Sequence, residues 1–133
     1  MSSIEETILT SSKTIAVVGL SANPERPSND VAGYLLEQGY EIIPVNPKES
    51  QILGQKAYPN LSSIPQKVDV VQIFRKPEDV PPIINEAIKI KAKAVWMQEG
   101  IINEQAAASA KDAGLMVVMN KCMFKEHQKL IGE

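Results

Sequence analysis

The sequence predicts an α/β fold in which an open, Rossmann-like parallel sheet of about five strands carries helices on both faces. Short apolar runs rich in β-branched residues alternate with segments of helical periodicity, which is typical of βαβ units. The apolar runs are continuous, as expected for a parallel sheet buried on both faces. Because 133 residues suffice for one core, we expect a single domain over residues 1–133.

The strands are expected where apolar, β-branched residues are continuous. In chain order they are Thr14–Gly19, Glu41–Val45, Val68–Phe74, Ala94–Met97 and Leu115–Met119. Right-handed crossovers would place every strand-to-helix loop along the carboxyl edge of the sheet. Ligands of open α/β sheets bind at that edge.

Helix boundaries are indicated by capping residues and by helical spacing. A capping box, Ser2 with Glu5 or Ser3 with Glu6, would start a short N-terminal helix. The other helices are expected from Ser28 or Asn29 to Gly39, from Asp79 to about Lys91, from about Asn103 to Ala113, and in a short segment after Met119.

Composition argues against several classes of partner. The formal net charge is −2, so no overall positive field would attract nucleic acid or an anionic membrane. No run approaches the roughly 18 apolar residues of a membrane helix, and the acidic start does not match a signal peptide. A single cysteine fits a reducing compartment. We therefore expect a cytoplasmic protein in which local groups hold any anionic ligand.

The first strand-to-helix turn, "GLSANPERPSN", resembles a nucleotide-binding turn without most of its glycines. Gly19 stands at the first position of the GxGxxG pattern, but Ser21 and Pro24 occupy the other two. Such a turn can still present backbone N–H groups and a helix N-terminus to a phosphate. The alternative is a polar connection that caps the helix and binds nothing. The candidate contacts are Gly19, Ser21, Ala22, Asn23, Arg26 and Ser28.

The end of the second strand, "PVNPKE", distinguishes between nucleotides. NAD-binding domains place an acidic residue here for the ribose hydroxyls, whereas this chain has Asn46, Pro47 and Lys48. A lysine favours a phosphorylated ribose, which both NADP and coenzyme A (CoA) carry. The alternative for Lys48 is an ordinary solvated loop lysine.

Two further loops are expected at the same edge. "IFRKP" follows the third strand, and its Phe74 and Arg75 would suit an adenine and a phosphate, although Phe74 could equally belong to the core. "MQEGI" follows the fourth strand, where Gln98 can donate and accept hydrogen bonds and Gly100 permits close approach to a ligand. The sequence therefore predicts a small nucleotide ligand bound by several converging loops.

These motifs together resemble a known family. They are Gly19–Pro24, Pro44–Lys48, Asp69–Val71, Phe74-Arg75, Trp96–Gly100, and Asn120–Cys122 with Glu126-His127. The set resembles the small stand-alone CoA-binding domains (YccU-like proteins), from about Lys13 to Leu130. That family is similar to the N-terminal, Rossmann-type domain of the succinyl-CoA synthetase α subunit. The resemblance implies that Ser21–Asn23, Lys48 and Gln98–Gly100 contact CoA.

No catalytic or metal-binding set is expected. Cys122 and His127 are the single cysteine and histidine, and five residues apart on a helix they would not share a face. We expect Cys122 to be a buried thiol and His127 a surface residue. The sequence thus favours non-catalytic binding of CoA or an acyl-CoA over an enzyme. The alternative is an NADP-binding reductase or redox sensor using the same edge, whose substrate region only a dimer could supply.

Overall fold

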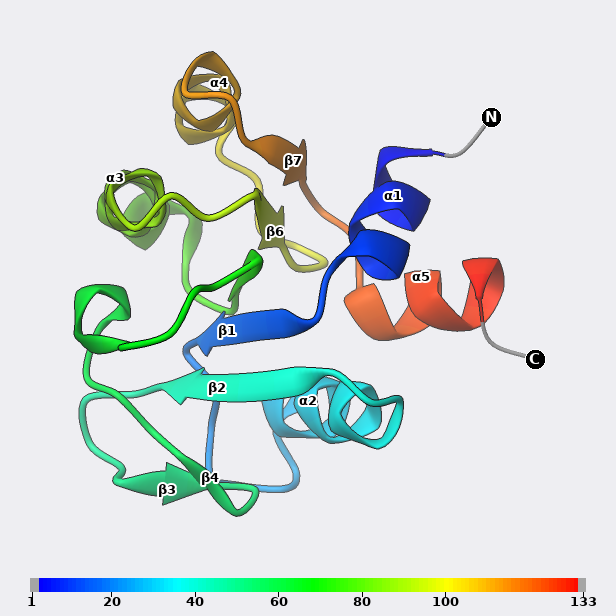
Figure 1. Cartoon of the computed structure of the whole chain (residues 1–133), viewed down its shortest axis with the longest axis vertical. Coiled ribbons are helices and arrows are strands. Elements are labelled where there is room, and N and C mark those ends of the chain that lie inside the picture. The colour runs from blue at the N-terminus through cyan, green and yellow to red at the C-terminus, as the bar shows by residue number, and fades with distance from the viewer. Residues whose placement is uncertain (1–2, 132–133) are drawn as a thin grey trace.

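The computed structural model describes residues 3–131 and contains a five-stranded parallel sheet (Figure 1). The strand order is β2-β1-β5-β6-β7, and each neighbouring pair is parallel. The bounds are Thr14–Val18 for β1, Glu41–Val45 for β2, Val70–Ile73 for β5, Ala94–Met97 for β6 and Met116–Val118 for β7. The predicted fold class is therefore confirmed.

Helices cover both faces of the sheet, as Figure 1 shows. Helices α3 (Val80–Lys89) and α4 (Glu104–Asp112) cover one face, and α1 (Ile4–Ser11), α2 (Pro27–Glu37) and α5 (Met123–Leu130) cover the other. Within residues 3–131, no helix has the length and apolar character needed to cross a bilayer.

The helix caps follow the sequence with small differences. Ser3 caps α1 by accepting from the Glu6 N–H, while Ser2, the alternative cap, lies outside the described residues. Asn103 caps α4 in the same way. Helix α2 begins at Pro27, slightly earlier than predicted, because proline suits the first helical position. Asp79 stands at the N-cap of α3 but makes no capping bond.

Two apolar clusters, one on each face, hold the layers together. Along β1 the side chains alternate, with Ala16 and Val18 facing the α3/α4 cluster and Ile15 and Val17 facing the α1/α2/α5 cluster. All of β1 is buried, as predicted for a parallel sheet covered on both faces. Burial of each large aliphatic side chain contributes about 1.5 to 3 kcal/mol. The rigid sheet that results fixes the positions of the loops at its carboxyl edge.

Asp69 joins the amino ends of β1 and β5. Its Oδ2 accepts hydrogen bonds from the N–H groups of Lys13 (2.8 Å) and Thr14 (3.1 Å), and its Oδ1 lies 3.6 Å from Lys93 Nζ. Burial alone would raise the pKa of Asp69, but these hydrogen bonds and the lysine charge outweigh it and lower the pKa. The ionised carboxylate therefore stabilises this end of the sheet.

The strand order reverses between β1 and β5, which makes this position the topological switch point of the sheet. The chain moves outward from β1 to β2, then crosses back to β5 and continues through β6 to β7. The returning connection holds a hairpin of β3 (Gln51–Ile52) and β4 (Gln55–Lys56) that the sequence analysis missed, because two-residue strands have no recognisable periodicity. Loops diverge at such a switch point and leave a crevice above the strand ends.

Candidate functional site

Gly19 brings the β1 loop against the β5 loop at the switch point. It has a φ of +90°, and a Cβ atom there would lie 2.4 Å from the carbonyl oxygen of Phe74 and 3.0 Å from Arg75 Cδ. Any residue with a side chain would therefore be strained and would also displace the β5 loop. Glycine at this position sets how closely Phe74 and Arg75 approach the first loop.

The polar side chains of the first loop bond mainly to the loop itself. The Ser21 N–H donates to Ser28 Oγ (3.0 Å), the Asn23 N–H to Ser21 Oγ (3.0 Å) and the Glu25 N–H to Asn23 Oδ1 (2.9 Å). Asn29 Nδ2 donates to the Ser21 carbonyl at 2.8 Å. These backbone N–H groups are thus engaged within the loop, so cationic side chains must supply much of any attraction for an anion.

Asn46 ties the end of β2 to the same loop. Its Nδ2 donates to the Leu20 carbonyl (3.0 Å), and its Oδ1 accepts from the Lys48 N–H (2.8 Å). This arrangement fixes the backbone of Lys48 and leaves its side chain exposed at the carboxyl edge.

A cavity of about 800 Å³ lies between these loops and the β5 loop, and we call it the cationic cavity. Its positive charge comes from the exposed residues Arg26, Lys48, Arg75 and Lys76. Arg75 Nη2 lies 3.4 Å from Asp79 Oδ2, but exposed ion pairs contribute at most about 1 kcal/mol. Arg75 can therefore exchange Asp79 for an anionic ligand. The other lining residues are Gly19, Leu20, Ser21, Pro27, Ser28, Asn46 and Phe74.

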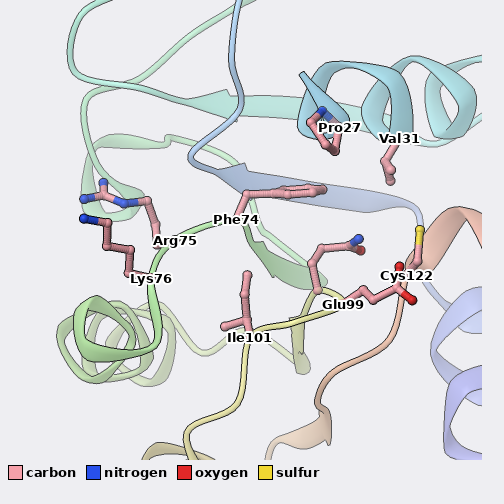
Figure 2. Close-up of a pocket in the computed structure, with 9 residues that line it drawn as sticks. Pro27, Val31, Phe74, Arg75, Lys76, Glu99, Ile101 and Cys122 are labelled. Carbon is pink, nitrogen blue, oxygen red and sulfur yellow. The ribbon is translucent and has the colours of Figure 1, made fainter. Parts of the chain in front are cut away.

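A second cavity, of about 450 Å³, adjoins the first between α2, the β5 loop and the start of α5 (Figure 2). We call it the apolar cavity because Val31, Ile101 and Cys122 join Pro27 and Phe74 in lining it. Gln98 and Glu99 complete its wall, and Pro27, Phe74, Arg75 and Lys76 border both cavities. Each volume lies in the range of about 300 to 1,000 Å³ that is usual for small-molecule sites.

Gln98 forms a polar patch in the wall of the apolar cavity. The residue is 4% exposed, and its Oε1 accepts from Gln72 Nε2 and from the Met123 N–H, each at 2.9 Å. Its Nε2 has no hydrogen-bond partner among residues 3–131 and is free for a ligand that lies in the cavity. Gln72 Oε1 is buried and also without a partner in that range. Gln72 lines neither cavity, so the donor that a ligand in the apolar cavity can reach is Gln98 Nε2.

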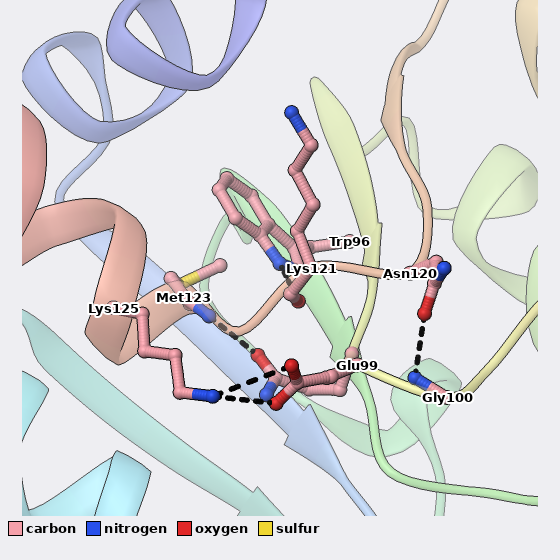
Figure 3. A network of polar contacts seen from close by, with 8 residues as sticks. Trp96, Glu99, Gly100, Asn120, Lys121, Met123 and Lys125 are labelled. Carbon is pink, nitrogen blue, oxygen red and sulfur yellow. Dashed lines mark hydrogen bonds and ion pairs between the residues drawn. The ribbon is translucent and has the colours of Figure 1, made fainter.

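The turn after β6 is held by the segment that follows β7 (Figure 3). Asn120 Oδ1 accepts from the Gly100 N–H at 2.8 Å, and Lys125 Nζ donates to the Glu99 carboxylate at 3.0 Å. Hydrogen bonding to Glu99 and the charge of its carboxylate raise the pKa of Lys125. The β6 loop and α5 are thereby joined at the mouth of the apolar cavity.

The family of the chain follows from a match along most of its length. The model of the CoA-binding domain family matches residues 13–128. The chain belongs to the CoA-binding domain family. The resemblance that the sequence indicated is therefore confirmed for the family as a whole.

Relatives of this CoA-binding domain include stand-alone chains and parts of larger proteins. YneT, an uncharacterized protein of Bacillus subtilis, is 42% identical over 90% of this chain and 89% of its own. A hypothetical protein from Pyrococcus horikoshii OT3 superimposes with a TM-score of 0.93 at 47% identity, covering 96% of this chain and 90% of the other. An ADP-forming acetate–CoA ligase of Archaeoglobus fulgidus is 29% identical over 82% of this chain but only 17% of its own.

Most of the candidate residues border the two cavities of this CoA-binding domain. The structure places Gly19, Ser21, Arg26, Ser28, Asn46, Lys48, Phe74 and Arg75 around the cationic cavity. Gln98 lines the apolar cavity. Pro47 instead lines a third cavity of about 310 Å³ beside Asp79, and Ala22, Asn23 and Gly100 border neither of the first two. Whether any of these residues contacts a ligand stays a prediction.

Several lining residues were missed from the sequence. Lys76 follows Arg75 directly, and its charge could have drawn attention to it. Val31 and Ile101 carry no recognisable signal because they look like core residues. Gln72 lines neither cavity but donates to Gln98 Oε1, and it had a signal, since a glutamine inside the apolar run "VVQIF" needs a polar partner. Phe74 is half-buried, packs against a core cluster and borders both cavities, and its contact with an adenine stays a prediction.

The expectation for His127 was wrong, and that for Cys122 was met only in part. Cys122, at the N-cap of α5, is half-buried: it packs against the α1/α2/α5 cluster and also lines the apolar cavity. His127 is only 4% exposed, and its Nδ1 lies 2.8 Å from the Tyr34 hydroxyl, with Tyr40 packed against its ring. Burial lowers the pKa of His127. Within residues 3–131, no cluster of three His, Cys, Asp or Glu side chains suits a metal ion.

Proposed function

We propose that the chain binds CoA or an acyl-CoA reversibly at the carboxyl edge of its sheet, without catalysing a reaction on it. The observation that carries this proposal is the cationic cavity, in which Arg26, Lys48, Arg75 and Lys76 surround one space at the switch point. The net charge of the chain is −2, so this concentration of positive charge is local. It suits a ligand with several phosphates.

The adjoining cavities match the two chemical halves of CoA. The phosphates and ribose would lie in the cationic cavity, with Lys48 near the ribose phosphate. The less charged pantetheine arm would continue past Phe74 into the apolar cavity, where Gln98 Nε2 would donate to an amide carbonyl of the arm. The ADP-forming acetate–CoA ligase, by its name, uses CoA, and its similarity to this chain supports the same ligand here.

A thermal-shift series tests the proposal. A ligand at about 100 times its Kd adds roughly 2.7 kcal/mol to stability, which corresponds to a Tm increase on the order of 10 °C. We expect this increase with CoA and a smaller one with dephospho-CoA, which lacks the ribose phosphate. Stabilisation by NADP but not by CoA would contradict the proposal and favour a reductase or redox sensor.

Substitutions then test the residues. Lys48→Ala and Arg75→Ala should each weaken CoA binding by about 1 to 3 kcal/mol, the range for hydrogen bonds to charged groups. Lys111→Ala is the matched control, because Lys111 is an exposed lysine on α4 that borders neither cavity. Calorimetric titration measures the affinities. If all three variants bind CoA with the wild-type affinity, Lys48 and Arg75 do not belong to the site.

A further inference from the structure

Cys122 lies at the end of the apolar cavity remote from the cations. Figure 2 shows Arg75 and Lys76 at one end of the lining residues and Cys122 at the opposite end, with the Phe74 ring between them. Cys122 is half-buried and is the single cysteine of the chain. Its thiol therefore has no intramolecular disulfide partner and faces a space open to a ligand.

The amide of Gln98 is a second, independent sign that the cavity receives a ligand. Gln98 is only 4% exposed, and it lines the cavity together with Cys122. Its Nε2 lacks a partner among residues 3–131, whereas its Oε1 is fully used. A carbonyl of the ligand would satisfy this donor. The cavity thus offers a cationic entrance, an amide donor in its wall and a thiol.

This order of groups matches the order of groups along CoA, which has phosphates at one end, amides in its arm and a thiol at the other end. We propose that Cys122 forms a reversible mixed disulfide with bound CoA, an inference that rests on the proposed function. A ligand anchored through its phosphates in the cationic cavity would extend its sulfur toward Cys122.

The reaction is thiol–disulfide exchange with CoA disulfide as the co-reactant. The Cys122 thiolate attacks one sulfur of CoA disulfide, the bond between Cys122 Sγ and that CoA sulfur forms, and the original S–S bond breaks. The second CoA leaves as a thiolate. Cys122 is oxidised and the departing CoA is reduced, so no other oxidant is needed. A free thiol reverses the step by the same exchange.

Intact-protein mass spectrometry tests the inference. Reduced wild-type protein is incubated with CoA disulfide or with glutathione disulfide, which lacks the nucleotide. We expect one CoA adduct, absent in Cys122→Ser, that forms about tenfold faster or more than the glutathione adduct because binding positions the disulfide beside the thiol. Lys48→Ala should slow the reaction with CoA disulfide only, and Lys111→Ala should slow neither.

A separate measurement distinguishes this inference from the proposed function. The Tm of the wild-type protein is measured with CoA in excess reductant, where no disulfide can form. Stabilisation by CoA without an adduct, or with equal adduct rates for both disulfides, would overturn the role of Cys122 and leave the proposed function intact. If CoA gives no stabilisation, the proposed function fails and the inference fails with it.

Discussion

Replacing Gly19 with alanine should damage both the fold and the site. The added Cβ would lie 2.4 Å from the Phe74 carbonyl oxygen, whereas ordinary contacts are 3.4 Å or longer. The β5 loop must therefore move by about 1 Å. Phe74 and Arg75 border both cavities, so this movement also shifts the walls of the proposed CoA site.

The cost has two parts that the structure separates. Holding alanine at a positive φ costs about 1 to 2 kcal/mol, and forcing a carbon into occupied space costs about 1 to 3 kcal/mol more. The expected total for Gly19→Ala is thus about 2 to 5 kcal/mol. CoA affinity should fall about tenfold, which is the loss of roughly one charged hydrogen bond from a displaced Arg75.

Gly114→Ala is the matched control. Gly114 has a φ of +91°, nearly the same as the +90° of Gly19, but a Cβ atom there meets nothing within 4 Å. Its substitution should cost only the backbone part and leave CoA affinity unchanged. Urea unfolding, followed by the fluorescence of the buried single tryptophan, measures the free energy of unfolding, and calorimetric titration measures affinity.

Two results would refute this reasoning. If Gly19→Ala and Gly114→Ala lower the free energy of unfolding equally, disturbing the close contact between the β1 and β5 loops does not destabilise the fold. Unchanged CoA affinity in a destabilised Gly19→Ala protein would show that this contact does not position Arg75 for the ligand.

Three further predictions concern titration and charge. Burial lowers the pKa of His127, so as pH falls this histidine is protonated in the unfolded chain before it is protonated in the folded one, and stability should decline below about pH 6.5. His127→Gln should therefore flatten the profile of Tm against pH between pH 7 and 5. An unchanged slope would contradict this. Because the pKa of Asp69 is lowered, its stabilisation of the folded state is fully present above about pH 4 and is lost as pH falls further. Asp69→Asn should therefore cost about 1 to 3 kcal/mol in urea unfolding at pH 7 and reduce the acid-induced loss, whereas wild-type stability would count against that role. Asp79→Asn should free Arg75 and tighten CoA binding by about 0.2 to 1 kcal/mol in calorimetry, and weaker binding would show that the ion pair helps to place Arg75.

The sheet was predictable because its strands are buried on both faces. Such strands must be apolar throughout, so a run such as residues 14–18 is visible without knowledge of its neighbours. Strand ends were less accurate, since Gly19 and Phe74 belong to apolar runs but lie in loops. The β3–β4 hairpin was missed because its pairing depends on the turn between the strands rather than on a repeated pattern.

The site was predictable where it depends on topology and unpredictable where it depends on packing. Loops after parallel strands converge whatever their sequences, so Lys48 and Arg75 could be assigned to one edge in advance. The apolar cavity depends instead on how α2 and α5 lie over the sheet, which brings Val31 and Cys122 together from distant parts of the chain. No periodicity in either helix indicates that contact.

Gln98 connects the recognition of a ligand with the position of the thiol. Its Oε1 accepts the Met123 N–H, which fixes the first turn of α5 directly after Cys122, while its Nε2 remains free beside the same cavity. Gln98 Nε2 is not among the fully buried polar atoms that lack a partner within residues 3–131, so this donor is accessible from the apolar cavity. A ligand carbonyl that accepts from this donor would hold the amide in the orientation that supports α5. The group that would select an amide-containing arm therefore also holds Cys122 at the cavity.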